Sequence, residues 1–273
     1  MFQKIFTLTA ISFLLAPTLS HAIEYQSPRT LGLGGSGRAT PLLGDSIYLN
    51  PSYASYAPIY SLSGGYSFLD PQARTYNVSV QDSRTEIFQA GVGYTKREDS
   101  SAVNIGASRI AIERLAVGIG SKFIINNQTR KMTADFIYST SYIGLFETVY
   151  TSFVIDNLLN NFSRTFYLGL KYNPTKNVNV FLDPFYSPTY NLGKKAGFHL
   201  GVELGLLADF AFRIGKFQNG EIPSLNTRGD GFGLGLGWMG PRISLDYAFA
   251  RATQTDRGDS LTTIHSFATT VFF

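Results

Sequence analysis

Few residues of this 273-residue chain could do acid-base, nucleophilic or metal chemistry, because it contains three histidines and no cysteine. A thiolate nucleophile, a disulfide and a cysteine-ligated metal are therefore excluded. Neither His199 nor His265 has an acidic residue at metal-ligand spacing on its own segment, which argues against a zinc site. The G-x-S-x-G motif is absent, although a Ser-His-Asp triad is a spatial arrangement that this absence does not exclude. We expect no enzyme activity, no metal and no cofactor.

Six ionisable residues stand in segments where small residues alternate with large apolar ones, namely Lys122, Lys171, His199, Glu203, Arg213 and Asp246. If these segments are strands of a closed barrel, alternation places all six on the inner wall. Lys122 and Arg213 could then hold an anionic headgroup such as a carboxylate. In the alternative, these cations pair with Glu203 and Asp246 or with the backbone of a segment inside the barrel, since barrel interiors are generally polar.

The elements that would position these residues are fourteen segments of alternating character between Ile59 and Phe273. The clearest is 230–239, where large apolar residues alternate with Gly231, Gly233, Gly235 and Gly237. In chain order the predicted strands are about 59–69, 73–82, 86–97, 102–111, 114–125, 130–141, 146–157, 163–173, 176–187, 195–207, 208–218, 230–239, 241–252 and 261–273.

Glycine rows and connection lengths favour a membrane barrel over a secreted β-sandwich, whose strands also alternate. A lumen-facing row of glycine makes room for an occupant, whereas the water-facing side of a sandwich has no need of one. If both chain ends are periplasmic, every even-numbered connection must be short. The even-numbered connections are tight, and the longest gaps are odd-numbered: Ser187 to Lys194, Gln218 to Gly229 and Ala252 to Ser260. The sequence predicts an all-β, antiparallel transmembrane barrel of about fourteen strands.

The stretch from Leu31 to Tyr53 differs from everything after it. Its glycines permit positive φ and close backbone approach. A helix-like run from Leu42 to Tyr48 follows and is stopped by Asn50-Pro51. Because the stretch is too glycine-rich to fold alone and too apolar for a linker, it predicts a plug (residues 23–58) inside a barrel (59–273). The residues expected to pack or gate the plug, with its leucines and isoleucine lining an apolar path, are Gly34, Gly35, Gly37, Leu42, Leu43, Ile47, Asn50 and Pro51.

Three motifs in this stretch resemble the N-terminus of the FadL-type fatty-acid channels and their PorV-type relatives: Leu33-Gly34-Gly35-Ser36, Asp45-Ser46-Ile47-Tyr48 and Asn50-Pro51. Shorter similar pieces follow in the same order, from Leu115 to Phe123, Val154 to Leu159, Leu200 to Leu206 and Gly231 to Tyr247. The chain departs from the family at Ser52-Tyr53, where A-G is usual, and in its short outer loops. The resemblance implies fourteen strands and a glycine-packed plug.

Residues 1–22 predict a secretory signal, with Lys4 before an apolar run and Ser20-His21-Ala22 at its end. Pro17 closes the apolar run too early for a membrane helix. Cleavage near Ala22 leaves 22 basic and 19 acidic side chains, a net charge of +3 that is too small to indicate nucleic-acid binding. We expect the mature protein in the outer membrane of a Gram-negative-type bacterium, in contact with its lipid.

Two functions fit this barrel. The first is passive transport of a hydrophobic or amphipathic small molecule. The second is a PorV-like scaffold that holds a secreted protein or a partner subunit at the surface. A lateral opening in the wall would favour transport, and an exposed apolar patch on the outer loops would favour the scaffold.

The last predicted strand carries a terminal aromatic residue, with Phe267, Val271 and Phe273 on one face. This pattern resembles the signal that the outer-membrane assembly machinery recognises. Deleting Phe273 should therefore leave a cleaved, protease-sensitive species in the periplasm. Fractionation and a heat-modifiability gel measure this, and a normal amount of folded barrel in the outer membrane would contradict the assignment.

Overall fold

The computed structural model describes residues 25–70, 73–159, 164–190, 193–207, 209–222, 227–256 and 262–273, so the predicted signal segment lies outside the described residues. The strands are β1 (Tyr60–Asp70), β2 (Ala73–Asp82), β3 (Gln89–Lys96), β4 (Ser100–Ile112), β5 (Leu115–Asn126), β6 (Met132–Leu145), β7 (Val149–Asp156), β8 (Thr165–Thr175), β9 (Val178–Tyr186), β10 (Ala196–Leu206), β11 (Phe210–Ile222), β12 (Thr227–Met239), β13 (Ile243–Thr255) and β14 (Thr262–Phe272).

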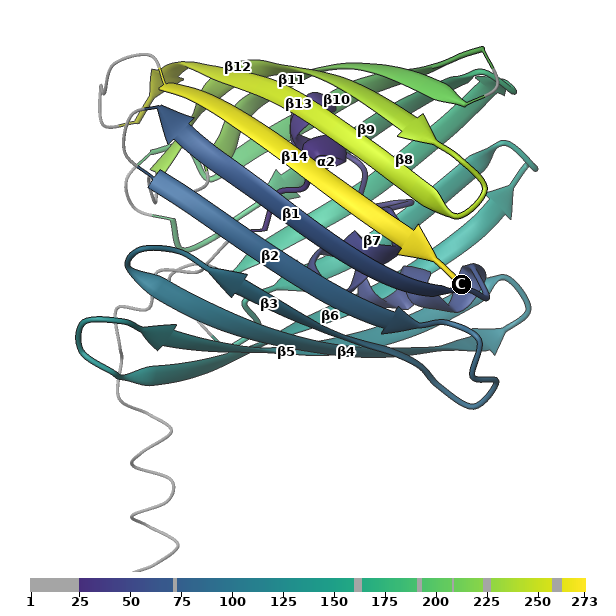
Figure 1. Cartoon of the computed structure of the whole chain (residues 1–273), viewed down its shortest axis with the longest axis horizontal. Coiled ribbons are helices and arrows are strands. Elements are labelled where there is room, and N and C mark those ends of the chain that lie inside the picture. Colours follow the sequence, from purple (N-terminus) through teal and green to yellow (C-terminus); the bar gives the residue numbers. More distant parts are fainter. Residues whose placement is uncertain are drawn as a thin grey trace, which may run out of the picture.

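These strands form one closed antiparallel barrel in chain order, as predicted (Figure 1). Closure comes from β1 and β14, which pair from Ser61–Phe272 to Asp70–Thr263. Even-numbered connections meet at the end of the barrel that holds Phe273, here called the short-turn end. The odd-numbered connections meet at the opposite, long-loop end. Each predicted strand overlaps an observed one.

Side-chain alternation separates the two faces of the wall as predicted. On β12, Leu234 and Leu236 are 37% and 57% exposed, while the glycines between them are buried. The outward side chains of the other strands are mostly large and apolar, and many of the inward ones are small or polar. No helix in the described part of the chain is both long and apolar enough to cross a membrane.

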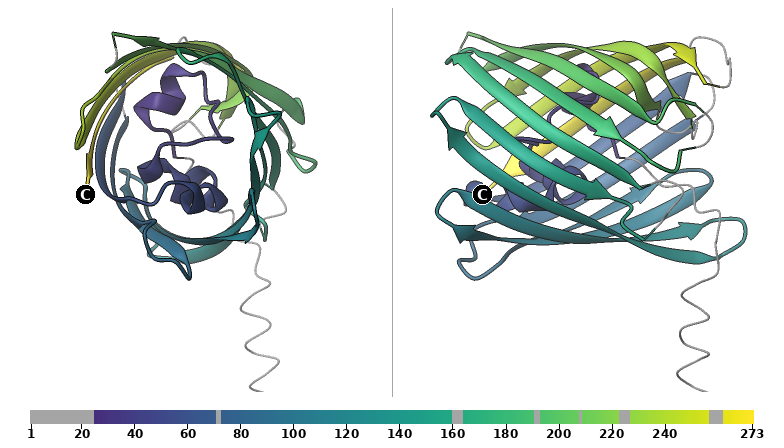
Figure 2. Two further views of the ribbon diagram at one scale, coloured as in Figure 1. Left: turned by 90° about the vertical axis from the view of Figure 1, so that its right-hand side faces the viewer. Right: turned by 180° about the vertical axis from the view of Figure 1, so that it is seen from behind.

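The main departure from the predicted strands lies between β11 and β12. The sequence predicts a long gap from Gln218 to Gly229, but β11 continues to Ile222 and β12 begins at Thr227. Register shifts occur between Phe217 and Gly220 and between Asp230 and Gly231. Such bulges bend a strand, and here the hairpin end turns into the barrel, where it is the light-green element inside the outline in Figure 2. We call residues 217–222 and 227–231 the inward hairpin.

Residues 25–57, here called the inner segment, lie inside the barrel (Figure 2). Helix α3 (Leu43–Leu49) confirms the predicted helical run, and Asn50 ends it with φ −164° and ψ 84°. Two further elements were not predicted, the short helix α2 (Pro28–Gly32) and the 3₁₀ turn η1 (Pro51–Tyr56). Ser27 caps α2 by accepting a hydrogen bond from the Thr30 N–H.

Replacing Leu234 by Arg places a charge on the outer face near the middle of β12, and unfolding free energy should fall by about 2–4 kcal/mol. Leu206, at the short-turn end of β10, is the matched control, where Arg should cost only about 0–1 kcal/mol. Denaturant titration of both variants in bilayers measures the difference. Equal stability of Leu234→Arg and wild type would reverse the assignment of inside and outside.

Candidate functional site

The inner segment approaches the wall closely at several inward glycines. A Cβ added at Gly201 would lie 2.8 Å from the Leu33 carbonyl oxygen, and one at Gly32 would lie 2.9 Å from the Cα of Gly235. Real Cβ atoms do not come so close. The predicted positive φ values are present at Gly34 (64°), Gly35 (88°) and Gly37 (121°). The glycine rows therefore form a recess for the backbone of this segment.

Buried hydrogen bonds hold the central turn of the inner segment. The Asp183 carboxylate on β9 accepts from the N–H groups of Gly37 and Arg38, both at 2.9 Å. Asn50 donates to the Arg38 carbonyl at 2.7 Å and to the Ser141 hydroxyl at 2.8 Å. Two successive N–H groups around one carboxylate oxygen make a small anion nest, so the wall fixes the turn by polar contacts as well as by shape.

A buried ion-pair network joins the inner segment to β10, β11 and β13. The Arg29 Nε lies 3.0 Å from a Glu203 oxygen, and the Arg213 Nε lies 2.7 Å from the same oxygen. Arg213 also donates to Asp246 at 2.5 Å. All four residues are less than a tenth exposed. Two cations thus face two carboxylates, so the network is neutral.

Of the remaining predicted lumen residues, Lys171 lies beside this network, over the same Phe181 ring as Arg29. Lys122 on β5 pairs with Asp156 of β7. Lys171 on β8 lies over the rings of Tyr150 and Phe181. His199 on β10 stacks near Phe185, with ring centroids 5.1 Å apart.

The proposed headgroup site at Lys122 and Arg213 is not assembled, because each cation faces a carboxylate of its own. The alternative, in which the cations pair with Glu203 and Asp246, holds for Arg213. Lys122 pairs with Asp156 instead. The predicted plug residues Ile47 and Pro51 contact the wall beside Gly106 and Gly120. Leu42 is partly buried, and the Leu43 side chain lies outside the described residues.

Sequence reasoning missed Arg29, Arg38, Asp183 and Arg228, which carry many of the polar contacts. Arg29 and Arg38 flank the glycine-rich stretch, and an arginine buried with such a stretch needs a carboxylate in the wall. The sequence thus shows that these two arginines need acidic partners, but it does not show which carboxylates they bind. The described residues contain no group of three or more histidines, aspartates and glutamates placed to hold a metal ion.

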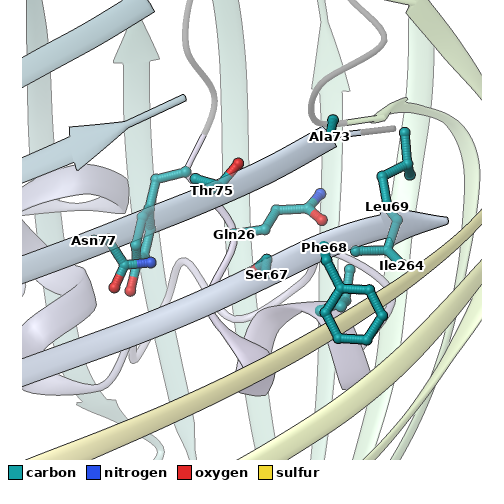
Figure 3. Close-up of a pocket in the computed structure, with 10 residues that line it drawn as sticks. Gln26, Ser67, Phe68, Leu69, Ala73, Thr75, Asn77 and Ile264 are labelled. Atoms are coloured by element: carbon teal, nitrogen blue, oxygen red, sulfur yellow. The ribbon is translucent and has the colours of Figure 1, made fainter. Parts of the chain in front are cut away.

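Two narrow pockets lie beside the start of the inner segment inside the barrel, and we call them together the chamber. One lobe is shown in Figure 3, with the Gln26 amide at its centre, facing Ser67, Leu69 and Ile264. The second lobe shares Gln26 and Ile264 and is bounded by Leu31, Phe217, Ile222, Ala250, Ala252 and His199. Its apolar side chains belong to one buried cluster that includes Leu31, Ile222 and Ile264. The long-loop half of the lumen therefore contains a packed apolar cluster beside the chamber.

Tyr25, which lines the first lobe, donates a 2.6 Å hydrogen bond to the Asp45 carboxylate of α3. Burial raises the pKa of Asp45 to about 6, because the charged carboxylate loses its hydration inside the protein. Tyr25 stacks on Tyr48, with ring centroids 3.9 Å apart. These contacts tie the start of the inner segment to α3.

Three solved structures resemble this barrel along nearly its whole length. The CymD monoaromatic hydrocarbon channel aligns with TM-score 0.68 and 12% identity, over 93% of this chain and 99% of its own. The Pseudomonas putida toluene transporter TodX aligns with TM-score 0.67 and 9% identity, over 91% of this chain and 98% of its own. A Pseudomonas aeruginosa FadL homologue aligns with TM-score 0.58 and 10% identity, over 90% of this chain and 98% of its own. The chain has the FadL-type fold.

The fold likeness agrees with the motifs of the N-terminal stretch. Protein-family models and curated proteins gave no match to the chain. At these low identities the comparisons show the fold alone. The kind of ligand has to be inferred from the residues that line the chamber.

A cysteine pair tests the position of α3 inside the FadL-type barrel. A Cβ at Gly106 would lie 3.6 Å from the Ile47 Cβ, which is disulfide geometry. Ile47→Cys with Gly106→Cys should therefore cross-link without added oxidant catalyst, as detected by mass spectrometry of a digest. Ile47→Cys with Gly205→Cys is the control, because Gly205 has Asn177 as its neighbour. Equal cross-linking of both pairs would show that α3 does not lie specifically beside Gly106.

Proposed function

We propose that this protein is an outer-membrane channel for passive movement of hydrophobic or amphipathic small molecules, and that the chamber is its binding site. The observation that carries this proposal is the apolar cluster of Leu31, Phe217, Ile222 and Ile264 inside the barrel, which borders the chamber. Apolar side chains that border a pocket give it the lining that a hydrophobic or amphipathic solute requires. The hydrocarbon channels that share the fold support the same solute class.

In this proposal the inner segment is the plug. Its backbone sits in the glycine recess, and Asp183, Ser139 and Ser141 hold it by hydrogen bonds. The chamber is narrow with the plug in place, so passage of a solute requires movement of the inner segment or of the inward hairpin. The barrel carries out no covalent chemistry in this scheme.

The scaffold alternative finds less support in the loops. In the described parts of the loops at the long-loop end, Leu159 is the exposed large apolar side chain. One such residue is far below a dedicated protein-binding patch. The other exposed apolar side chains of that half point outward from strands, where lipid would cover them.

Filling the chamber tests the transport proposal. Ala250 is 2% exposed and lines the second lobe, so Ala250→Phe should occupy the solute's place. Uptake of toluene and of a fatty acid into liposomes should fall toward that of protein-free vesicles. Ile119→Phe is the control, because Ile119 is 55% exposed on the outer face.

Unchanged uptake in a correctly folded Ala250→Phe barrel would show that the chamber is not on the path. Uptake by wild type no faster than by empty vesicles, for every solute of the panel, would reject the transport function altogether. Co-purification of a stoichiometric partner protein would then favour the scaffold.

A further inference from the structure

The short-turn end of the barrel carries large apolar residues that the protein itself leaves uncovered. Phe146, between β6 and β7, is 83% exposed, and Leu207, directly after β10, is 88% exposed. Ile112, the last residue of β4, is 69% exposed, and Phe88, directly before β3, is 55% exposed. We call these four the rim residues. Two described connections at the long-loop end, 97–99 and 127–131, contain no apolar residue.

Two of the rim residues hold a backbone conformation that large side chains avoid. The angle φ is 50° at Phe146 and 45° at Leu207. Glycine and asparagine adopt this left-handed region readily, whereas a bulky residue there is strained. A turn that served only the folding of the barrel would carry one of those two residue types. Strain at an exposed apolar residue points to a role outside the barrel.

The rim residues continue the apolar outer face of the wall. Ile112 pairs with Leu115, which lies on the same face of β5 as the outward side chain of Ile119. Leu145, the last residue of β6, is also exposed and directly precedes Phe146. The part of the surface that would meet lipid therefore extends from the strands into these turns.

Two arginines stand among the rim residues without a carboxylate partner. The Arg114 Nη1 donates to the Gly144 carbonyl at 3.0 Å, which ties the β4–β5 turn to β6. The Arg109 guanidinium lies 5.9 Å from the ring centroid of Phe88. Neither arginine forms an ion pair with any residue that the structure describes. Apolar side chains beside an exposed cation are typical of residues at a membrane surface, where the charge stays at the level of the lipid phosphates.

We propose that the short-turn rim is a lipid-anchoring surface, in which the rim residues enter the headgroup region of the leaflet at that end of the barrel. Exposed apolar patches mark membrane contacts as well as protein contacts, and continuity with the outer wall favours lipid. Glu113 and Glu147 stand in the same turns. Because a carboxylate loses its hydration in hydrocarbon, the rim stays at headgroup level. This surface concerns how the barrel is held in the bilayer, not what crosses it.

Tryptophan fluorescence in brominated lipid tests the rim. Trp238→Phe removes the single tryptophan of the chain, and Phe146→Trp or Leu207→Trp then places one reporter on the rim. In vesicles of phosphatidylcholine brominated on its acyl chains, both reporters should lose fluorescence, most with bromine close to the headgroup. Gln128→Trp, exposed in a connection at the long-loop end, is the matched control and should be quenched by aqueous iodide instead. Heat-modifiability shows that each variant is folded.

A second control, Leu234→Trp on the outer face of β12, should be quenched most with bromine deep in the acyl chain. Rim reporters that respond to iodide as Gln128→Trp does would overturn the lipid anchor and leave the channel proposal standing. Shielding from both iodide and brominated lipid would also overturn it, because a second copy of the chain would then cover the rim. If Leu234→Trp itself escapes lipid quenching, the wall does not meet lipid, and the proposed outer-membrane channel fails as well.

Discussion

A fourteen-stranded barrel encloses more space than its own inward side chains can fill, and the rest of this structure follows from how that space is filled. Here the backbone of the inner segment packs against the backbone of the wall, because the wall carries glycine where the inner segment passes. Gly201 and Gly235 have room for no side chain beside Leu33 and Gly32. Such contact buries N–H and C=O groups, which explains why Asp183, Ser139 and Ser141 in the wall bond to the inner segment.

The wall could be predicted from sequence because its signal is local. Period-two alternation, as in Phe232 to Trp238, shows which face of a strand meets lipid. The connection lengths show at which end of the barrel each strand begins. The inner helix α3 was also predictable, since Asn50-Pro51 must end it. The short helix α2 was missed because its five residues carry no full turn of apolar periodicity.

The site was less predictable, since its contacts join distant parts of the chain. Glu203, Arg213 and Asp246 were correctly placed on the inner wall, but nothing in their spacing shows that Arg29 completes the set. The gap from Gln218 to Gly229 looked like an outer loop, because its glycines and proline suit a turn as well as they suit bulges. Its inward course brings Arg228 of β12 to Ser187, which follows β9, a contact that the spacing of these residues in the sequence does not show.

The glycine recess also bears on the order of folding. Helix α2 lies against β11, β12, β13 and β14, so the first described residues of the chain rest on the last strands to be synthesised. The inner segment thus has no place to dock until the C-terminal strands exist, and contacts of such sequence separation form slowly. The chain must keep its inner segment undocked during insertion, and closure of β1 on β14 then traps inside the barrel a stretch that was made before any of the strands.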